Sequence, residues 1–159
     1  MRINNSKVKN FIISVYFILV VLSVFSAIVF SSFRHLTPYP ILTFALIVLF
    51  FAGILFLVHR ISRYFEYDSD GVKVSIINRG LILSDYTNYR EKILEFEKDR
   101  LITFKFNDYL FYKTLDIYIR DRKGGKKKET FNITLLPKKK RRYIRQSLSK
   151  MVKMNANPL

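Results

Sequence analysis

Two stretches decide the fold: FIISVYFILVVLSVFSAIVFSSF at residues 11–33 and ILTFALIVLFFAGILFLV at residues 41–58. Neither contains a charged residue. At about 1.5 Å per helical residue the first would span about 34 Å, enough to cross a bilayer hydrocarbon core of ~30 Å. The segment between them contains Pro38 and Pro40, which break a helix and favour a turn. The sequence therefore predicts an antiparallel transmembrane hairpin within residues 11–60.

Basic residues flank this hairpin unevenly, and their distribution predicts its orientation. Three lie within residues 2–9, before the first span, whereas the loop between the spans has only Arg34 and His35. Because positive charge favours the cytoplasmic side, both ends of the hairpin should face the cytoplasm of a bacterial cell, with residues 1–10 as a cytoplasmic tail. A cleaved signal peptide over residues 1–30 is the alternative, although its apolar core would exceed the usual 7–15 residues or so. In either case the following domain stays inside.

The residues that follow the second span should mark the inner surface of the membrane. Arg60 and Arg63 are placed to meet lipid head groups, and Tyr64 has the aromatic character favoured at the membrane interface. Residues 60–159 hold 24 of the 28 Lys and Arg residues and all 12 Asp and Glu, so their net charge is 24 − 12 = +12. The chain has no cysteine, which excludes disulfides, thiolate metal sites and a cysteine nucleophile.

Alternating apolar and polar residues predict a sheet domain over residues 61–153, followed by a tail at 154–159. Pro137 suits the first turn of a closing helix, whose apolar residues recur at helical spacing. About seven strands are expected, at residues 64–68, 72–76, from 81 onward, 93–98, 101–106, 115–119 and 131–135. The expected core between sheet and helix comprises Ile117, Ile119, Ile133, Leu135, Ile144 and Leu148.

The chain resembles the small bacterial pleckstrin-homology-like membrane proteins that carry an N-terminal two-helix hairpin. The resemblance rests on the order of elements, on YDSDGV at residues 67–72, and on NITLL at residues 132–136. It implies an α+β membrane protein: a transmembrane hairpin, then a PH-like antiparallel sheet or partial barrel capped by the C-terminal helix. It also implies binding or scaffolding rather than catalysis. Two features depart from the eukaryotic relatives: the last helix has no tryptophan, and the phosphoinositide-binding basic pattern is missing around Lys73 and Arg79.

Two basic clusters are the candidate binding sites for lipid or a partner. The first is predicted at the tip of a hairpin turned by Gly124-Gly125, where the alternative is a solvated loop that protects a sheet edge. The second lies in the first turns of the last helix, where cations oppose the helix dipole and so favour a binding role. The second cluster is the run of five cations at residues 138–142. The candidate residues are Arg122, Lys123, Lys126, Lys127 and Lys128 in the first cluster and Lys138, Lys139 and Arg142 in the second.

No catalytic, cofactor-binding or metal-binding residues are predicted. His35 and His59 flank the spans, and the paired carboxylates Glu95 and Glu97 should lie on a solvated strand face. We therefore expect a non-enzymatic accessory or scaffolding subunit of an inner-membrane complex. Its partners would be a larger integral membrane protein and either anionic lipid head groups or an acidic protein. The alternative is a membrane-tethered module that contacts nucleic acid or the ribosome.

Overall fold

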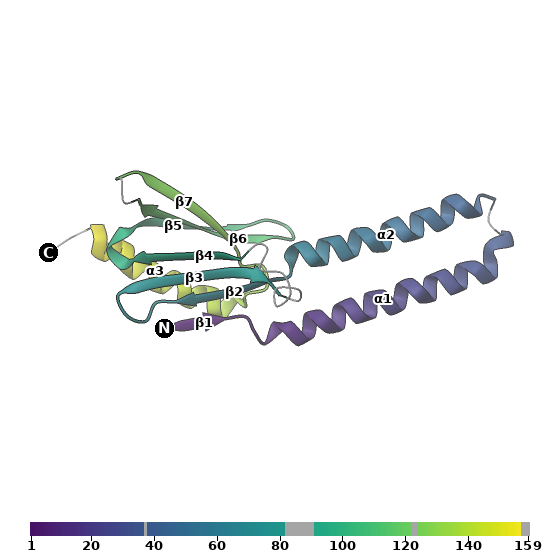
Figure 1. Cartoon of the computed structure of the whole chain (residues 1–159), viewed down its shortest axis with the longest axis horizontal. Helices are drawn as coiled ribbons and strands as arrows, with labels where there is room; N and C mark the ends of the chain where they lie inside the picture. Colours follow the sequence, from purple (N-terminus) through teal and green to yellow (C-terminus); the bar gives the residue numbers. More distant parts are fainter. Residues whose placement is uncertain (37, 82–90, 122–123, 157–159) are drawn as a thin grey trace. The chain divides into compact units, whose positions relative to one another are not determined.

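The computed structural model describes residues 1–36, 38–81, 91–121 and 124–156, and it divides into two units. The first comprises Lys7–Arg60 and is helical. The second combines Met1–Ser6 with the chain from Ile61 onward, and we call it the sheet domain. Figure 1 traces both along the sequence.

The helical unit is an antiparallel pair in which apolar side chains are exposed almost everywhere. It contains α1 (Val8–Phe33), the short 3₁₀ helix η1 (Arg34–Leu36) and α2 (Pro40–Ile61), which confirms the two helices predicted from residues 11–33 and 41–58. Ile12 is the one buried residue of α1, and α2 has none. A core helix of a soluble protein would bury one face. Both helices are long and apolar enough to cross a membrane.

The sheet domain contains two antiparallel sheets and a helix, in agreement with the predicted α+β class. Sheet A has the order β1-β2-β3-β4 and sheet B the order β5-β6-β7, joined by the 3₁₀ helix η2. The bounds are β1 (Arg2–Asn4), β2 (Arg63–Asp68), β3 (Lys73–Gly80), β4 (Lys92–Glu97), η2 (Lys98–Arg100), β5 (Leu101–Asp108), β6 (Lys113–Arg120), β7 (Lys126–Asn132) and α3 (Lys138–Ala156).

Strand β1 is the main departure from the expected architecture. Residues 1–10 are predicted as a tail, but Arg2–Asn4 pairs antiparallel with β2, and Ile3 lies opposite Tyr67. Ile3 is buried as part of the core. Burial of this side chain, together with the ladder hydrogen bonds, explains why so short a segment is ordered. The N-terminal segment and the chain after α2 thus belong to one sheet.

One core fills the sheet domain between the sheets and α3. Ile144 and Leu148 are fully buried, as predicted, and they pack with Ile117, Ile119 and Ile133. Leu135 is only half-buried, in contrast to the prediction, and Leu136 takes its place in the core. The reason is that β7 ends at Asn132, so the alternation of strand faces does not continue into the turn before α3.

The two ends of the sheet domain differ in their connections. We call the end where the chain leaves at Ser6 and returns at Ile61 the junction end. There Asn132 Nδ2 donates to the carbonyl of Ile61 at 3.5 Å, and Lys140 Nζ donates to the carbonyl of Asn4 at 2.6 Å. At the far end, Asn155 Nδ2 donates to the carbonyl of Lys98 at 2.7 Å. Helix α3 therefore runs from the junction end to η2, with its basic N-terminal turns at the junction end.

Candidate anion-binding cleft

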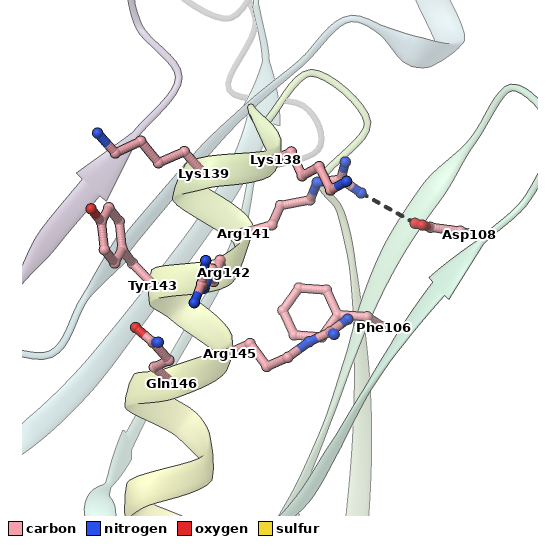
Figure 2. Close-up of a pocket in the computed structure, with 9 residues that line it drawn as sticks. All are labelled: Phe106, Asp108, Lys138, Lys139, Arg141, Arg142, Tyr143, Arg145 and Gln146. Atoms are coloured by element: carbon pink, nitrogen blue, oxygen red, sulfur yellow. Dashed lines mark hydrogen bonds and ion pairs between the residues drawn. The ribbon is translucent and has the colours of Figure 1, made fainter.

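A cleft of about 870 Å³ lies between the N-terminal half of α3 and the end of β5. Its walls are mostly cationic side chains from α3, with one aromatic and one carboxylate from β5 (Figure 2). The lining residues are Phe106, Asp108, Lys138, Lys139, Arg141, Arg142, Tyr143, Arg145 and Gln146. Five cations against one carboxylate leave a formal charge of +4, which suits an anionic ligand.

The helical repeat of α3 directs these cations into the cleft. Ile144, Leu148 and Met151 occupy the buried face and fix the rotation of the helix. Residues three and four positions apart share a face of a helix, so Lys138, Arg141 and Arg145 form a stripe beside the buried one. Figure 2 shows Arg141 and Arg145 extending from this stripe toward β5.

Two arginines of the cleft are held by contacts to β5. Arg141 Nη1 donates to Asp108 Oδ1 at 3.2 Å, and the Arg141 side chain is 18% exposed. The guanidinium of Arg145 stacks over the ring of Phe106, 4.9 Å from its centroid. Such contacts orient a guanidinium and reduce the entropy it loses when it binds an oxyanion. Among the described residues, no group accepts a hydrogen bond from the buried Nε of Arg141.

The other three cations have no such partner in the part of the chain that the structure describes. Within the described part of the chain, Lys138, Lys139 and Arg142 form no ion pair and no side-chain hydrogen bond, and all three are exposed. These are the residues that the sequence singles out in the second basic cluster. The structure brings them together with Arg141 of the same cluster and with Arg145, Phe106 and Asp108, which were not predicted.

The lysines of the first basic cluster lie elsewhere. The predicted hairpin is formed by β6 and β7, and Lys126, Lys127 and Lys128 are the first residues of β7, directly after the turn at Gly124. Lys126 pairs with Arg120 in the ladder, whereas Asn132 at the other end of β7 is close to Ile61. Six strand steps of about 3.3 Å put these lysines up to ~20 Å from the junction end. Arg122 and Lys123 fall outside the described residues.

These strand lysines also have partners within sheet B. Lys128 Nζ lies 2.9 Å from Asp116 Oδ2, and Lys127 Nζ lies 3.1 Å from Glu129 Oε1. Lys126 Nζ sits over the ring of Tyr118, 4.7 Å from the centroid. Burial would raise the pKa of Asp116, but hydrogen bonds from Lys128, Thr130 and Asn107 outweigh it and lower that pKa. These three lysines therefore contact neighbours within sheet B and do not line the cleft.

The predicted interface residues divide between the two units. Arg60 lies in the last turn of α2, and Arg63 opens β2, where its carbonyl accepts a hydrogen bond from Asn5 Nδ2 at 2.9 Å. The Tyr64 hydroxyl donates to Glu66, and burial together with this hydrogen bond raises the pKa of Tyr64 to about 12. The Tyr64 hydroxyl is thus already bound by Glu66, a residue of the same strand.

Comparisons with known proteins identify no relative, since no family model, no curated protein and no solved structure matches the chain.

Proposed function

We propose that this protein is a non-enzymatic accessory or scaffolding protein of the bacterial inner membrane whose α3 cleft binds the phosphate groups of anionic lipids. In this proposal α1 and α2 cross the membrane as a hairpin, and the sheet domain lies on the cytoplasmic face. A larger integral membrane protein docks on the hairpin.

The exposed apolar surface of the two helices supports the membrane part of the proposal. Side chains such as Phe17 in α1 and Leu49 in α2 are 69% and 67% exposed, and comparable residues surround both helices. Hydrocarbon is the environment in which such surface is stable. Strand β1 supports the proposed topology, because it precedes α1 and pairs with β2, which follows α2, as expected if both ends of the hairpin are on the same side of the membrane.

The strand order supports a PH-like fold for the sheet domain. A sheet of four strands is followed by a sheet of three and then by a helix that covers the core, as the resemblance implies. In this reading the hairpin is inserted between β1 and β2. Fold alone does not define a ligand, so the ligand is inferred from the cleft.

The single observation that carries the ligand assignment is the position of the cleft at the junction end. Lys140, in the middle of the basic turns, contacts Asn4, only two residues before the chain leaves the sheet domain at Ser6. If the helices span the bilayer, the chain connections at Ser6 and Ile61 keep this end of the domain near the membrane surface. Each basic residue near an anionic surface is attracted by roughly 1 kcal/mol, and the bound head group would lie within reach of Lys138, Lys139 and Arg142.

The hairpin itself offers a surface to a membrane partner. A shallow groove of about 630 Å³ lies between α1 and α2 and is lined by aromatic and small residues, including Phe30, Phe51 and Ser26. Phe30 and Phe44 already contact across the two helices, with ring centroids 5.7 Å apart. Small residues beside bulky ones permit close helix packing in a membrane.

Native mass spectrometry of the full chain in mild detergent tests the ligand. The parent protein should retain anionic phospholipid in preference to phosphatidylcholine, and the triple variant Lys138→Glu, Lys139→Glu, Arg142→Glu should lose that preference. The control variant Lys73→Glu, Lys150→Glu, Lys153→Glu has the same change in net charge at exposed positions outside the cleft, and it should keep the preference.

Equal retention by the parent and the cleft variant would contradict lipid binding at this site. RNA retained by the parent and lost in the same variant would instead favour the alternative function, a membrane-tethered module that contacts nucleic acid or the ribosome. The same samples should show unchanged circular dichroism, so that loss of the fold is not mistaken for loss of the site.

A further inference from the structure

The turn between β5 and β6 exposes three consecutive apolar side chains. Asp108 and Lys113 pair at the base of the hairpin, and Tyr109 N donates to the Tyr112 carbonyl at 2.8 Å. Tyr109, Leu110 and Phe111 are 60%, 89% and 73% exposed. We call residues 109–111 the apolar tip. Turns of soluble domains normally carry polar residues and glycine, so this composition calls for a partner surface.

The apolar tip lies at the junction end of the sheet domain. Thr114, next to the base of the hairpin, pairs with Asn132, and Ile133 N donates to the Lys113 carbonyl at 2.9 Å. Asn132 in turn donates to the carbonyl of Ile61, where the chain arrives from α2. The base of the β5–β6 hairpin and the attachment point of α2 are therefore linked through one residue.

Cations surround the base of the apolar tip. Asp108, directly before it, binds Arg141 at 3.2 Å and Lys113 at 3.5 Å, and the rest of the cleft lies along the same strand end. Aromatic and aliphatic residues flanked by Lys and Arg form the usual pattern of a segment in the interface between head groups and acyl chains. A polar protein surface would not match three exposed apolar side chains.

We propose that the apolar tip inserts into the interfacial region of the same bilayer that α1 and α2 cross. Leu110 and Phe111 enter the boundary between head groups and acyl chains, and Tyr109 keeps its hydroxyl at the head-group level. The tip then acts as a third attachment beside the two helix connections and holds the cleft against the head groups. This inference rests on the proposed function, because it requires that the helices span the membrane.

Single tryptophans test the insertion directly, because the chain contains no tryptophan of its own. The full chain is reconstituted in nanodiscs of phosphatidylcholine and phosphatidylglycerol, with and without bromine on the acyl chains. The Leu110→Trp variant should emit at shorter wavelength than a tryptophan in water and be quenched by bromine near the glycerol end of the acyl chain. Phe111→Trp should show the same emission shift and quenching. It replaces one aromatic residue by another, so it controls for a perturbation caused by the substitution at position 110.

Two further variants calibrate the result. Val72→Trp replaces an apolar side chain that is 79% exposed, in the turn after β2 at the far end of the domain, and it should show no quenching. Leu49→Trp, near the middle of α2, should be quenched most strongly by bromine near the methyl end of the acyl chain.

Each outcome separates the two proposals. If Leu110→Trp and Phe111→Trp remain unquenched while Leu49→Trp is quenched, the insertion is overturned and the membrane-spanning hairpin stands. Equal quenching at positions 110 and 72 also overturns it, since the domain would then lie on the bilayer without a defined tip. An unquenched Leu49→Trp overturns the proposed function and the insertion together.

Discussion

Asn5 binds the backbone of Phe65 and so joins the segment before α1 to the strand after α2. Its side-chain oxygen accepts from Phe65 N at 2.9 Å, and its own backbone N–H donates to the Phe65 carbonyl at 3.2 Å. Asn5 is 1% exposed, so these polar groups have no water to replace the partner. Residues 60 positions apart are thereby held side by side at the junction end.

Truncation of this side chain should destabilise the domain. Asn5→Ala leaves the buried Phe65 N–H without an acceptor, which typically costs about 1–3 kcal/mol. Equilibrium unfolding of the full chain in mild detergent, followed by circular dichroism, measures the change. Asn10→Ala, at an exposed position of α1, is the matched control and should have little effect. A loss equal to that of the control would show that Asn5 does not join the two segments.

The shared sheet also predicts the accessibility of three single cysteines in a chain that has none. Ser6→Cys and Val72→Cys should resist an impermeant maleimide in intact cells and react once the membrane is permeabilised. Tyr39→Cys, between the helices and 72% exposed, should react in intact cells. The reverse pattern would invert the proposed orientation. Different behaviour at positions 6 and 72 would contradict the pairing of β1 with β2, because one sheet cannot lie on two sides of a membrane.

Leu148 tests the packing of α3. The residue is fully buried among both sheets, and Leu148→Ala should lower the free energy of unfolding by about 2–5 kcal/mol, as cavity formation does in other cores. Leu135→Ala removes the same atoms from a half-buried position and should cost clearly less. Denaturant titration of the full chain compares them. Similar losses at both positions would mean that α3 does not form the cover of the core.

Asp116 predicts a pH dependence of stability. Its side chain is 5% exposed and receives hydrogen bonds from Lys128, Thr130 and Asn107, which lower its pKa below the ordinary 3.8 despite burial. A lowered pKa means that the folded state binds this proton less readily than the unfolded state. The stabilisation of the folded state by the Asp116 carboxylate is therefore complete above about pH 4, and it is lost as the pH falls through the lowered pKa.

The corresponding variant is Asp116→Asn. At neutral pH it should be less stable than the parent by about 1.5–3 kcal/mol, the range for hydrogen bonds to a charged group. The difference in the free energy of unfolding should become smaller when the pH falls below about 4, because Asp116 of the parent is then protonated. Unfolding curves at several pH values measure this, with Glu97→Gln on the exposed face of β4 as a control. A difference that does not change with pH would exclude the charge as its cause.

The parts of the fold that depend on local pattern are predictable from the sequence. Apolar length defines α1 and α2, and helical spacing identifies Ile144 and Leu148 as the buried face of α3. Strand β1 is not predictable in this way, since three residues carry no periodicity and the partner strand follows a long insertion. The glycine pair correctly marks a turn, with Gly124 at φ 81°, but it does not show where the strand resumes.

The residues of the cleft are likewise only partly predictable from the sequence. Lys138, Lys139 and Arg142 are recognised because cations at a helix N-terminus oppose its dipole. Arg141 belongs to the same predicted run of cations, and Arg145 shares a helical stripe with Lys138 and Arg141, so helical spacing could have identified it. Phe106 and Asp108 could not be found, because only the tertiary packing of α3 against β5 brings them to these arginines.

Strand β1 has a consequence for biosynthesis. Residues 2–4 are translated before either helix, and their partner in β2 is translated only after both. The edge of the sheet therefore cannot close until both helices have been made and the segments before and after them have come together. Contacts of such long sequence separation form late and slowly. During this interval Ile3, which later joins the core, has no partner strand, and an exposed apolar segment of this kind favours aggregation.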